Sequence, residues 1–265
     1  MTARRANGRV LREFAEHPGR YLAWDNGGRI TRHLDERACV VVAPTWAVVT
    51  AVDVEEDGVA ELLDDVRRLV PRGARTEWYI GPSDRPAGLA EELKALGVRE
   101  PGDGSGSLDA LLLDREPTGV PTTVETREVV TMSDYADAAE VRWEAFDMGE
   151  DEREHERGFL VGYYEDYVRT KDESMIGFVA TVDGRVAGSA AALLSDRGLF
   201  LIGGASAPWA RGRGVYRALV AARWRYALDR GTPALAVHAI RDTSSPILRR
   251  LGFERLFAVR HLEGL

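Results

Sequence analysis

Apolar and polar residues in the second half of the chain follow a regular succession of strand-like and helix-like patterns. Alternation or a short apolar block predicts a strand, and apolar residues three and four positions apart predict a helix. The predicted strands are Thr122–Val130, Met175–Val182, Val186–Leu194, Leu199–Ala207, Ala234–Ala239 and Phe253–Leu262. The predicted helices are one that Ser133 caps and that runs to about Met148, one over roughly Glu152–Thr170, one after Gly214, and a short one that ends at Leu251-Gly252. Asp183-Gly184 is a strong signal for a two-residue hairpin turn between two of the strands.

The first half of the chain repeats part of this pattern. Its predicted elements are strand material over Ala38–Val52, a helix over Asp57–Val70, a strand over Thr76–Ile80, a helix that begins near Pro86 and closes on Leu96-Gly97-Val98, and a strand over Leu108–Leu113. A polar run with Pro and Gly follows at Asp114–Pro121, and this composition is typical of a linker. We therefore predict two domains, residues 1–117 and residues 122–265.

The junction between the Leu199–Ala207 strand and the next helix has the most informative local sequence, Pro208-Trp209-Ala210-Arg211-Gly212-Arg213-Gly214-Val215-Tyr216. Glycine lets a ligand approach the backbone closely and adopts positive φ without strain. The first amides of a helix have no intrahelical partner and carry a partial positive charge. With the charges of Arg211 and Arg213, these features predict a phosphate or pyrophosphate site. The alternative is a glycine-rich connection that only caps the helix.

The helix that follows this junction is predicted to have one apolar face. That face carries Val215, Leu219, Ala222 and Tyr226. Its outer side is rich in arginine, and we place Arg217 and Arg223 there.

The spacing of the junction excludes two common phosphate loops. A dinucleotide fingerprint needs a third glycine at position 217, which is Arg, and the Gly-Lys-Ser/Thr triplet of a P-loop does not occur. The segment instead resembles the coenzyme A pyrophosphate loop of the GNAT superfamily of N-acetyltransferases, which has the pattern Arg/Gln-x-x-Gly-x-Gly/Ala after a Pro. Arg211, Gly214 and Pro208 match this pattern, whereas Tyr216 replaces the final small residue. Leu251-Gly252-Phe253 also resembles the frequent close of the family's domain.

This resemblance covers the second half of the chain. It implies an α/β fold with a mixed central sheet flanked by helices, the GNAT or acyl-CoA N-acyltransferase fold. The first half has no Arg-x-x-Gly-x-Gly loop between its helix and strand. We interpret it as a degenerate GNAT-like copy, which would make the chain a tandem protein. An unrelated small α/β domain is the alternative.

The resemblance also implies acetyl-CoA as the co-substrate. Its pantetheine arm would lie between Leu199–Ala207 and Ala234–Ala239, which splay apart in this fold. The residues expected to bind the cofactor are Ala205, Ser206, Ala207, Arg211, Gly212, Arg213, Gly214, Val215 and Tyr216.

Catalytic groups do not follow from the resemblance. Many family members have a Tyr four residues before the closing glycine, which protonates the departing thiolate, and that position here is Leu248. The Asn that the family often has earlier on the same loop is absent from Arg241–Ser245. His238 lies on the strand that should flank the thioester and has a suitable intrinsic pKa, so it is a candidate. The alternative is a structural histidine, and we assign no catalytic residue.

The acceptor pocket of this fold is usually shaped by the first two helices. Their junction here, Glu144–Glu154, is strongly acidic and would attract a cationic amine. Nearby aromatic residues that could add cation–π contacts are Trp143, Phe146, Tyr163 and Tyr164. The alternatives are a solvated acidic loop and aromatic core residues.

Composition and charge limit the classes of protein to which the chain can belong and the cellular compartment in which we expect it. A net charge of -8 argues against a general nucleic-acid-binding protein. The chain has no apolar run near 18 residues and no signal peptide pattern, so we expect no membrane association and a cytoplasmic protein. The single cysteine, Cys39, fits a reducing compartment and is expected to be a buried, inert thiol. The five histidines do not have metal-ligand spacing, so no metal is expected.

The sequence therefore predicts an acetyl-CoA-dependent N-acetyltransferase that acts on an amine of a small molecule. The alternative is a non-catalytic coenzyme A-binding or scaffold protein of the same fold, which the missing Tyr at position 248 favours. Acetylation of protein lysines is a third hypothesis. The sequence leaves the oligomeric state open, a homo-oligomer included.

Overall fold

The computed structural model describes residues 8–23, 30–102, 104–121 and 123–265, and these fold into two compact units. Unit 1 consists of Leu113–Ala236 and Arg250–Phe253. Unit 2 consists of the described part of Ala6–Leu112 with Val237–Arg249 and Glu254–Leu265.

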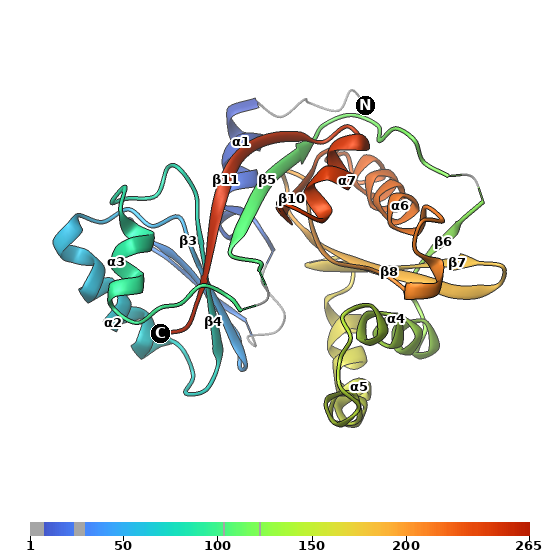
Figure 1. The fold of residues 1–265 in the computed structure, drawn as a ribbon, viewed down its shortest axis with the longest axis horizontal. Coiled ribbons are helices and arrows are strands. Elements are labelled where there is room, and N and C mark those ends of the chain that lie inside the picture. The colour runs from blue at the N-terminus through green and yellow to red at the C-terminus, as the bar shows by residue number, and fades with distance from the viewer. Residues whose placement is uncertain (1–7, 24–29, 103, 122) are drawn as a thin grey trace. The chain divides into compact units, whose positions relative to one another are not determined.

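Unit 1 is built on a mixed sheet with helices on both faces (Figure 1). Its strands, in spatial order, are β6 (Glu125–Glu128), β7 (Met175–Val182), β8 (Arg185–Leu194), β9 (Leu199–Ser206) and the start of β10 (Leu235–Ile240). Neighbouring strands are antiparallel except for β9 and β10, which are parallel. The helices are α4 (Met132–Ala145) and α5 (Glu150–Thr170) below the sheet in the figure, and α6 (Val215–Asp229) above it. This confirms the predicted α/β fold with a mixed sheet flanked by helices.

The start of α4 differs from the prediction. Thr131 rather than Ser133 is the N-cap, and its side chain accepts a hydrogen bond from the Asp134 amide while Asp134 accepts one from the Thr131 amide. Burial on its own raises the pKa of Asp134, but hydrogen bonds from Thr131 and from Arg127 outweigh it and bring the pKa to about 2. The prediction was wrong by two residues because two hydroxyl residues flank the helix start and only one can form this reciprocal pair.

The hairpin turn at Asp183-Gly184 is confirmed. Both residues have positive φ, 53° and 76°, and Val182 pairs with Arg185 across the turn. Two consecutive left-handed residues match the twist of the flanking strands.

Helix α6 packs closely on β8 because Gly188 has no side chain. A Cβ at Gly188 would overlap Cγ1 of Val215 and approach Leu219. Arg217 is exposed as predicted, whereas Arg223 is 1% exposed and faces the sheet. The prediction for Arg223 was wrong because residue type alone placed it outside, although position 223 lies on the same helical face as Leu219.

The strands of unit 2 have the spatial order β1-β2-β3-β4-β11-β5. The bounds are β1 (Thr31–Leu34), β2 (Cys39–Val42), β3 (Trp46–Thr50), β4 (Arg75–Ile80), β5 (Ser107–Leu113) and β11 (Glu254–Glu263). Helices α2 (Val59–Leu69) and α3 (Leu89–Ala95) pack together on one face and share a core with these strands (Figure 1). The remaining helices are α1 (Gly8–Glu16), α7 (Ser244–Arg250) and the 3-10 turns η1 (Pro18–Arg20), η2 (Glu56–Gly58) and η3 (Pro208–Ala210), of which η3 belongs to unit 1.

The compact units combine segments that are distant in the sequence. Strand β11 pairs with β4 on one side and with β5 on the other, so the C-terminal strand is internal to unit 2. The boundary at 117–122, and the interpretation of the first half as a degenerate GNAT-like copy, remain predictions.

The predicted burial of the Cys39 thiol can be compared with the structure. Cys39 is fully buried, and burial raises its pKa to about 11, which confirms an inert thiol. Among the residues that the structure describes, no group of three His, Cys, Asp or Glu side chains is placed to hold a metal ion. None of the described helices is long and apolar enough to cross a membrane.

A buried histidine of unit 2 predicts how stability depends on pH. His17 is 3% exposed and lies 2.7 Å from Ser83 Oγ and 3.1 Å from Thr50 Oγ1. Burial, with a smaller contribution from Arg20, lowers the pKa of His17 from 6.5 to about 4. Between these values the unfolded chain binds more protons than the folded one, so stability falls as the pH falls.

We expect the free energy of unfolding to drop by up to about 3 kcal/mol through His17 alone when the pH falls from 7 to 4. Asp84 contributes with the opposite sign, because burial raises its pKa to about 7. The effect of His17 is therefore isolated as the difference between the parent and His17→Gln, measured by urea denaturation at several pH values. The exposed His33 provides the control variant His33→Gln. Equal pH dependence in the parent and His17→Gln would contradict the prediction.

Candidate functional site

The outer part of β9 contains a β-bulge. Ser189 pairs with Ala205 and Ala191 pairs with Ile202, which leaves one extra residue on β9. Gly203 adopts φ 58° at this point. Bulges of this kind bend a strand and redirect its backbone, and they are frequent near functional sites.

Beyond the bulge, one edge of β9 is available to a ligand. The Ala207 amide donates to the Ala187 carbonyl, so the alternation of the ladder turns the N–H and C=O of Ser206 away from β8. Among the described residues, β9 and β10 pair only at Leu199–Leu235 and Phe200–Ala236. The backbone of Ser206 therefore lies on an edge that no described ladder uses.

The connection from β9 to α6 turns twice at glycine. After η3, Gly212 has φ 78° and Gly214 has φ 86°, and Gly214 is the N-cap of α6. A Cβ at Gly212 would meet no atom within 4 Å, whereas one at Gly214 would lie 2.8 Å from Pro121 Cγ. A glycine is thus required at position 214 for two reasons: the backbone has a positive φ, and Pro121 leaves no room for a side chain.

We call the unbonded amides of this connection the phosphate cradle. They belong to Gly212, Gly214, Val215 and Tyr216, and none of them donates a hydrogen bond to another described residue. Three of them lie at the N-terminus of a 15-residue helix, where the partial positive charge of the helix is concentrated. Free amides on a glycine turn at a helix start are suited to bind an anionic phosphate group.

The two arginines of the loop already have partners. Arg213 Nη2 forms an ion pair with Asp183 Oδ2 at 2.8 Å, and Arg211 Nη2 donates to the Ala145 carbonyl at 3.4 Å. Both side chains are exposed. Asp183 therefore competes with an anionic ligand for Arg213.

We expect Asp183→Asn to raise the affinity for coenzyme A by about two- to five-fold, the range of a partly exposed ion pair. Asn tolerates the left-handed conformation of position 183, so the turn is retained. Calorimetric titration of the variant measures the change. Asp196→Asn, which removes an exposed carboxylate at the other end of β8, is the matched control and should leave the affinity unchanged. An unchanged affinity in Asp183→Asn would mean that Arg213 does not contact the ligand.

The structure shows how two aromatic side chains pack next to the cradle, Trp209 and the predicted cofactor-binding residue Tyr216. Arg185 lies over the ring of Trp209 at 4.4 Å from its centroid, which fixes the side chain next to the loop. The Tyr216 ring covers Gly204, since a Cβ there would lie 2.6 Å from Cε2 of Tyr216. Tyr216 therefore takes the place of a small residue because β9 provides glycine opposite it.

The catalytic candidates from the sequence lie in structural surroundings. His238 Nε2 is 2.9 Å from the carbonyl of Ala15, which only accepts hydrogen bonds, so Nε2 carries the proton. Burial lowers the pKa of His238 to about 4, so that it is neutral near pH 7. Leu248 is fully buried in unit 2. These contacts agree with the structural alternative for His238, and its role in catalysis stays untested.

The acidic junction lies between α4 and α5, near a cavity of about 550 Å³ in unit 1. Asp137, Glu140 and Glu144, which share one face of α4, line this cavity together with Arg153 and Arg185. Arg153 donates to backbone carbonyls and Glu140 pairs with Arg157. The carboxylates of Asp137 and Glu144 form no ion pair among the described residues.

The four aromatic residues of this region divide into core and surface. Trp143 is fully buried and donates to Glu156, and Tyr164 donates to the Val130 carbonyl. Phe146 and Tyr163 are 61% and 47% exposed. Only these last two are available to a ligand.

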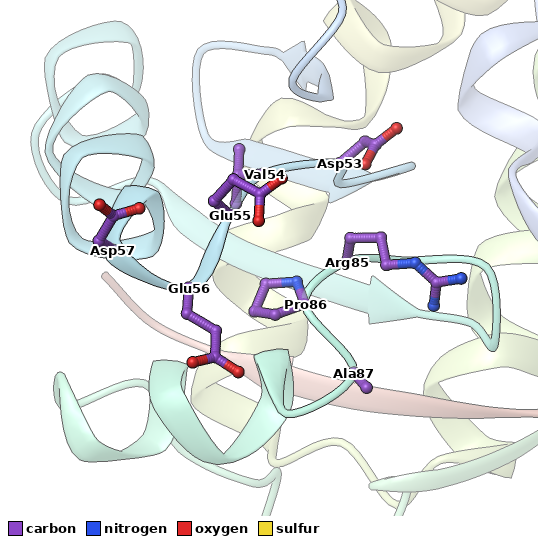
Figure 2. Close-up of a pocket in the computed structure, with 8 residues that line it drawn as sticks. All are labelled: Asp53, Val54, Glu55, Glu56, Asp57, Arg85, Pro86 and Ala87. Atoms are coloured by element: carbon purple, nitrogen blue, oxygen red, sulfur yellow. The ribbon is translucent and has the colours of Figure 1, made fainter.

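A cavity of about 690 Å³ in unit 2 is also rich in carboxylates (Figure 2). The side chains that line it include Asp53, Glu55, Glu56, Asp57 and Arg85. Figure 2 shows that the carboxylates of Asp57 and Glu56 point in different directions rather than toward a common point. This divergence leaves no convergent ligand set for a metal ion in that cavity.

Comparison with known proteins finds a family match for the segment that carries the cradle. Residues 135–253 match the model of the acetyltransferase (GNAT) family. No curated protein matches the chain in sequence.

Solved structures are similar over most of the chain. A GCN5-related N-acetyltransferase from Kribbella flavida has a TM-score of 0.65 at 16% identity, covering 96% of this chain and 95% of that one. A GCN5-related N-acetyltransferase from Sphaerobacter thermophilus has a TM-score of 0.54 at 18% identity, covering 97% of this chain and 84% of that one. A tandem GNAT protein from the clavulanic acid biosynthesis pathway has a TM-score of 0.56 at 13% identity, covering 86% and 78%. At these identities the similarity establishes the fold.

Proposed function

Because residues 135–253 match the model of the acetyltransferase (GNAT) family, we propose that the protein is an acetyl-CoA-dependent N-acetyltransferase that acts on an amine of a small molecule. The observation that carries the cofactor assignment is the phosphate cradle. Four free amides, two of them on left-handed glycines, surround the start of α6. The amides of Gly214, Val215 and Tyr216 would be unbonded at any helix start, so what favours a diphosphate ligand over a simple helix cap is the second left-handed glycine, Gly212, with its own unbonded amide.

Acetyl-CoA, when bound, supplies an acyl thioester, and the residues of the chain bind and orient it. The cradle amides and Arg211 would hold the diphosphate. The N–H and C=O of Ser206 lie on the edge of β9 that no described strand pairs with, beyond the bulge. They would form hydrogen bonds with the amides of the pantetheine arm. Holding the thioester in one orientation lowers the entropic part of the barrier to acyl transfer.

The acceptor assignment rests on the cavity beside α4. Its unpaired carboxylates, Asp137 and Glu144, would attract a cationic amine, and the cavity of about 550 Å³ suits a small molecule. An amine with a pKa near 10 arrives as an ammonium ion and has to lose a proton before it attacks. Carboxylates that bind the ammonium ion therefore favour capture of the substrate, and deprotonation must follow.

The test is thiol release from acetyl-CoA across a panel of small amines, beside a titration with coenzyme A. The panel contains an aliphatic diamine, an amino sugar, an arylalkylamine and a lysine-containing peptide. We expect turnover with a cationic small amine, and a rise in KM without loss of coenzyme A affinity in the double variant Asp137→Asn/Glu144→Gln. Turnover with the peptide alone would favour protein-lysine acetylation.

The burial of Leu248 favours the second candidate, a coenzyme A-binding protein without turnover. Saturable binding of coenzyme A with no thiol release on any amine would establish it. We also expect one coenzyme A per chain, because the first half has no glycine cradle of this type. Two equivalent sites in the calorimetric titration would show that the first half binds the cofactor as well.

A further inference from the structure

Arg223 of α6 is a buried cation without a carboxylate partner. It is 1% exposed, and it forms no ion pair with any described Asp or Glu. Its Nε donates to the Leu219 carbonyl at 3.0 Å and its Nη1 to the Ala191 carbonyl at 3.1 Å. Its Nη2 is buried and donates to no described acceptor. The guanidinium is thus held at a fixed place with part of its donor capacity and all of its charge unmatched.

A buried arginine without a carboxylate partner destabilises the folded protein. Transfer of a charge from water to the protein interior is unfavourable unless an opposite charge compensates it. Burial lowers the pKa of Arg223 to about 10, so the side chain nevertheless stays protonated near neutral pH. A methionine of similar length would pack against the same strands without this cost, so packing alone does not account for an arginine here.

The place of the guanidinium connects it with the cradle. Side chains of a helix lean toward its N-terminus, and the bond to the Leu219 carbonyl puts the guanidinium a full turn closer to the start of α6 than its own Cα. It lies beside the side chain of Tyr216, whose amide belongs to the cradle. Leu219 and Tyr216 are separated by about 5 Å along the axis, and the Leu219 carbonyl points away from the cradle, so the cation lies on the order of 10 Å from the cradle amides.

We propose that Arg223 is the buried counter-charge of a diphosphate bound in the cradle, and that it selects diphosphate ligands without touching them. The proposal rests on the proposed function, because it concerns the same cradle. Arg223 is buried, so its attraction for an anion in the cradle is screened less than that of the exposed Arg211 and Arg213. A bound diphosphate supplies the negative charge that the described residues do not.

The proposal predicts an effect that follows ligand charge. Arg223→Met is expected to weaken binding of coenzyme A and of inorganic pyrophosphate by about ten-fold. It should leave binding of pantetheine, which has no phosphate, within about two-fold of the parent. Arg223→Lys retains the charge and should recover most of the affinity for the two phosphate ligands.

Arg225→Met is the matched control. Arg225 lies on the same helix with an exposed side chain that donates to Thr126, so its removal changes the net charge equally. We expect its effect on all three ligands to be less than about two-fold at 0.15 M salt, where exposed charges are screened.

Calorimetry of the full chain with the three ligands measures these affinities, after circular dichroism has shown that each variant is folded. If Arg223→Met does not fold, Arg223→Gln replaces it, and its affinities for the three ligands are compared with those of Arg223→Lys. Equal losses for coenzyme A and pantetheine, or no recovery in Arg223→Lys, would overturn the proposal and leave Arg223 as a packing residue. Failure of the parent to bind coenzyme A would instead overturn the proposed function, and the parent titration alone decides that.

Discussion

Replacement of Gly214 by valine is expected to weaken coenzyme A binding about 100-fold or more, because two costs of together about 3 kcal/mol fall on one residue. Valine is strained at φ 86°, since its branched Cβ crowds the backbone in the left-handed region. Its Cβ would also lie 2.8 Å from Cγ of Pro121, so either the loop or the linker has to move. Movement of the loop misplaces the amides that form the cradle. Titration with coenzyme A measures the loss.

The two costs can be separated by matched variants. Gly73 has φ 84° with no atom within 4 Å of an added Cβ, and it lies in unit 2. Gly73→Val should therefore show the conformational cost in stability with no loss of coenzyme A affinity. Pro121→Gly removes the clash, so the double variant Pro121→Gly/Gly214→Val should recover part of the affinity. Parent-like binding by a folded Gly214→Val would remove the basis for the cradle.

Replacement of Asp109 by asparagine is expected to lower the stability of unit 2 strongly. Asp109 is 3% exposed and accepts hydrogen bonds from Arg255 at 2.7 Å, Ser245 at 2.8 Å and Arg241 at 3.4 Å. These bonds tie the start of α7 and the strand β11 to β5. Loss of the charge leaves two arginines unmatched, though both are partly exposed, and we expect a loss of about 2–4 kcal/mol in the free energy of unfolding.

Urea denaturation measures this loss, and the exposed Asp114 gives the control Asp114→Asn, which should stay within about 0.5 kcal/mol of the parent. Burial opposes ionisation of Asp109, but bonds from Arg255 and Ser245 prevail and hold its pKa below the usual range. The stabilisation is therefore present above the usual pKa of an aspartate and is lost as the pH falls below it. A change under 1 kcal/mol in Asp109→Asn would show that water replaces the carboxylate at this site.

The local pattern of apolar and polar residues was sufficient to predict most of the helices and strands of unit 1. The strand Met175–Val182 has the predicted bounds, and the turn at Asp183-Gly184 forms as its residue types require. In unit 2, the helix α1 and the strand β1 were not predicted. Four residues of β1 are all exposed and therefore show no apolar alternation. Helix α1 spans only nine residues, so its stability comes from the residues that it packs against rather than from its own sequence.

The glycine turns and the helix start of the candidate site were predictable because they are adjacent in the sequence. Its other features depend on residues far away along the chain. The ion pair of Arg213 with Asp183, the contact of Pro121 with Gly214 and the bond of Arg223 to Ala191 join segments that only the fold brings together. Rules based on the spacing of residues along the sequence do not predict contacts of this kind. Residue type alone placed Arg223 on the wrong face of its helix.

The internal position of β11 also constrains how the chain is made. A ribosome synthesises residues in order, and β4 and β5 leave it long before residues 254–263 exist. Until then both strands lack their shared neighbour, so unit 2 cannot complete its sheet although nearly all of its other residues have been made. Translation therefore has to run past the whole of unit 1 first. Unpaired strand edges pair readily with other chains, so chaperones that cover them during this interval should raise the yield of folded protein.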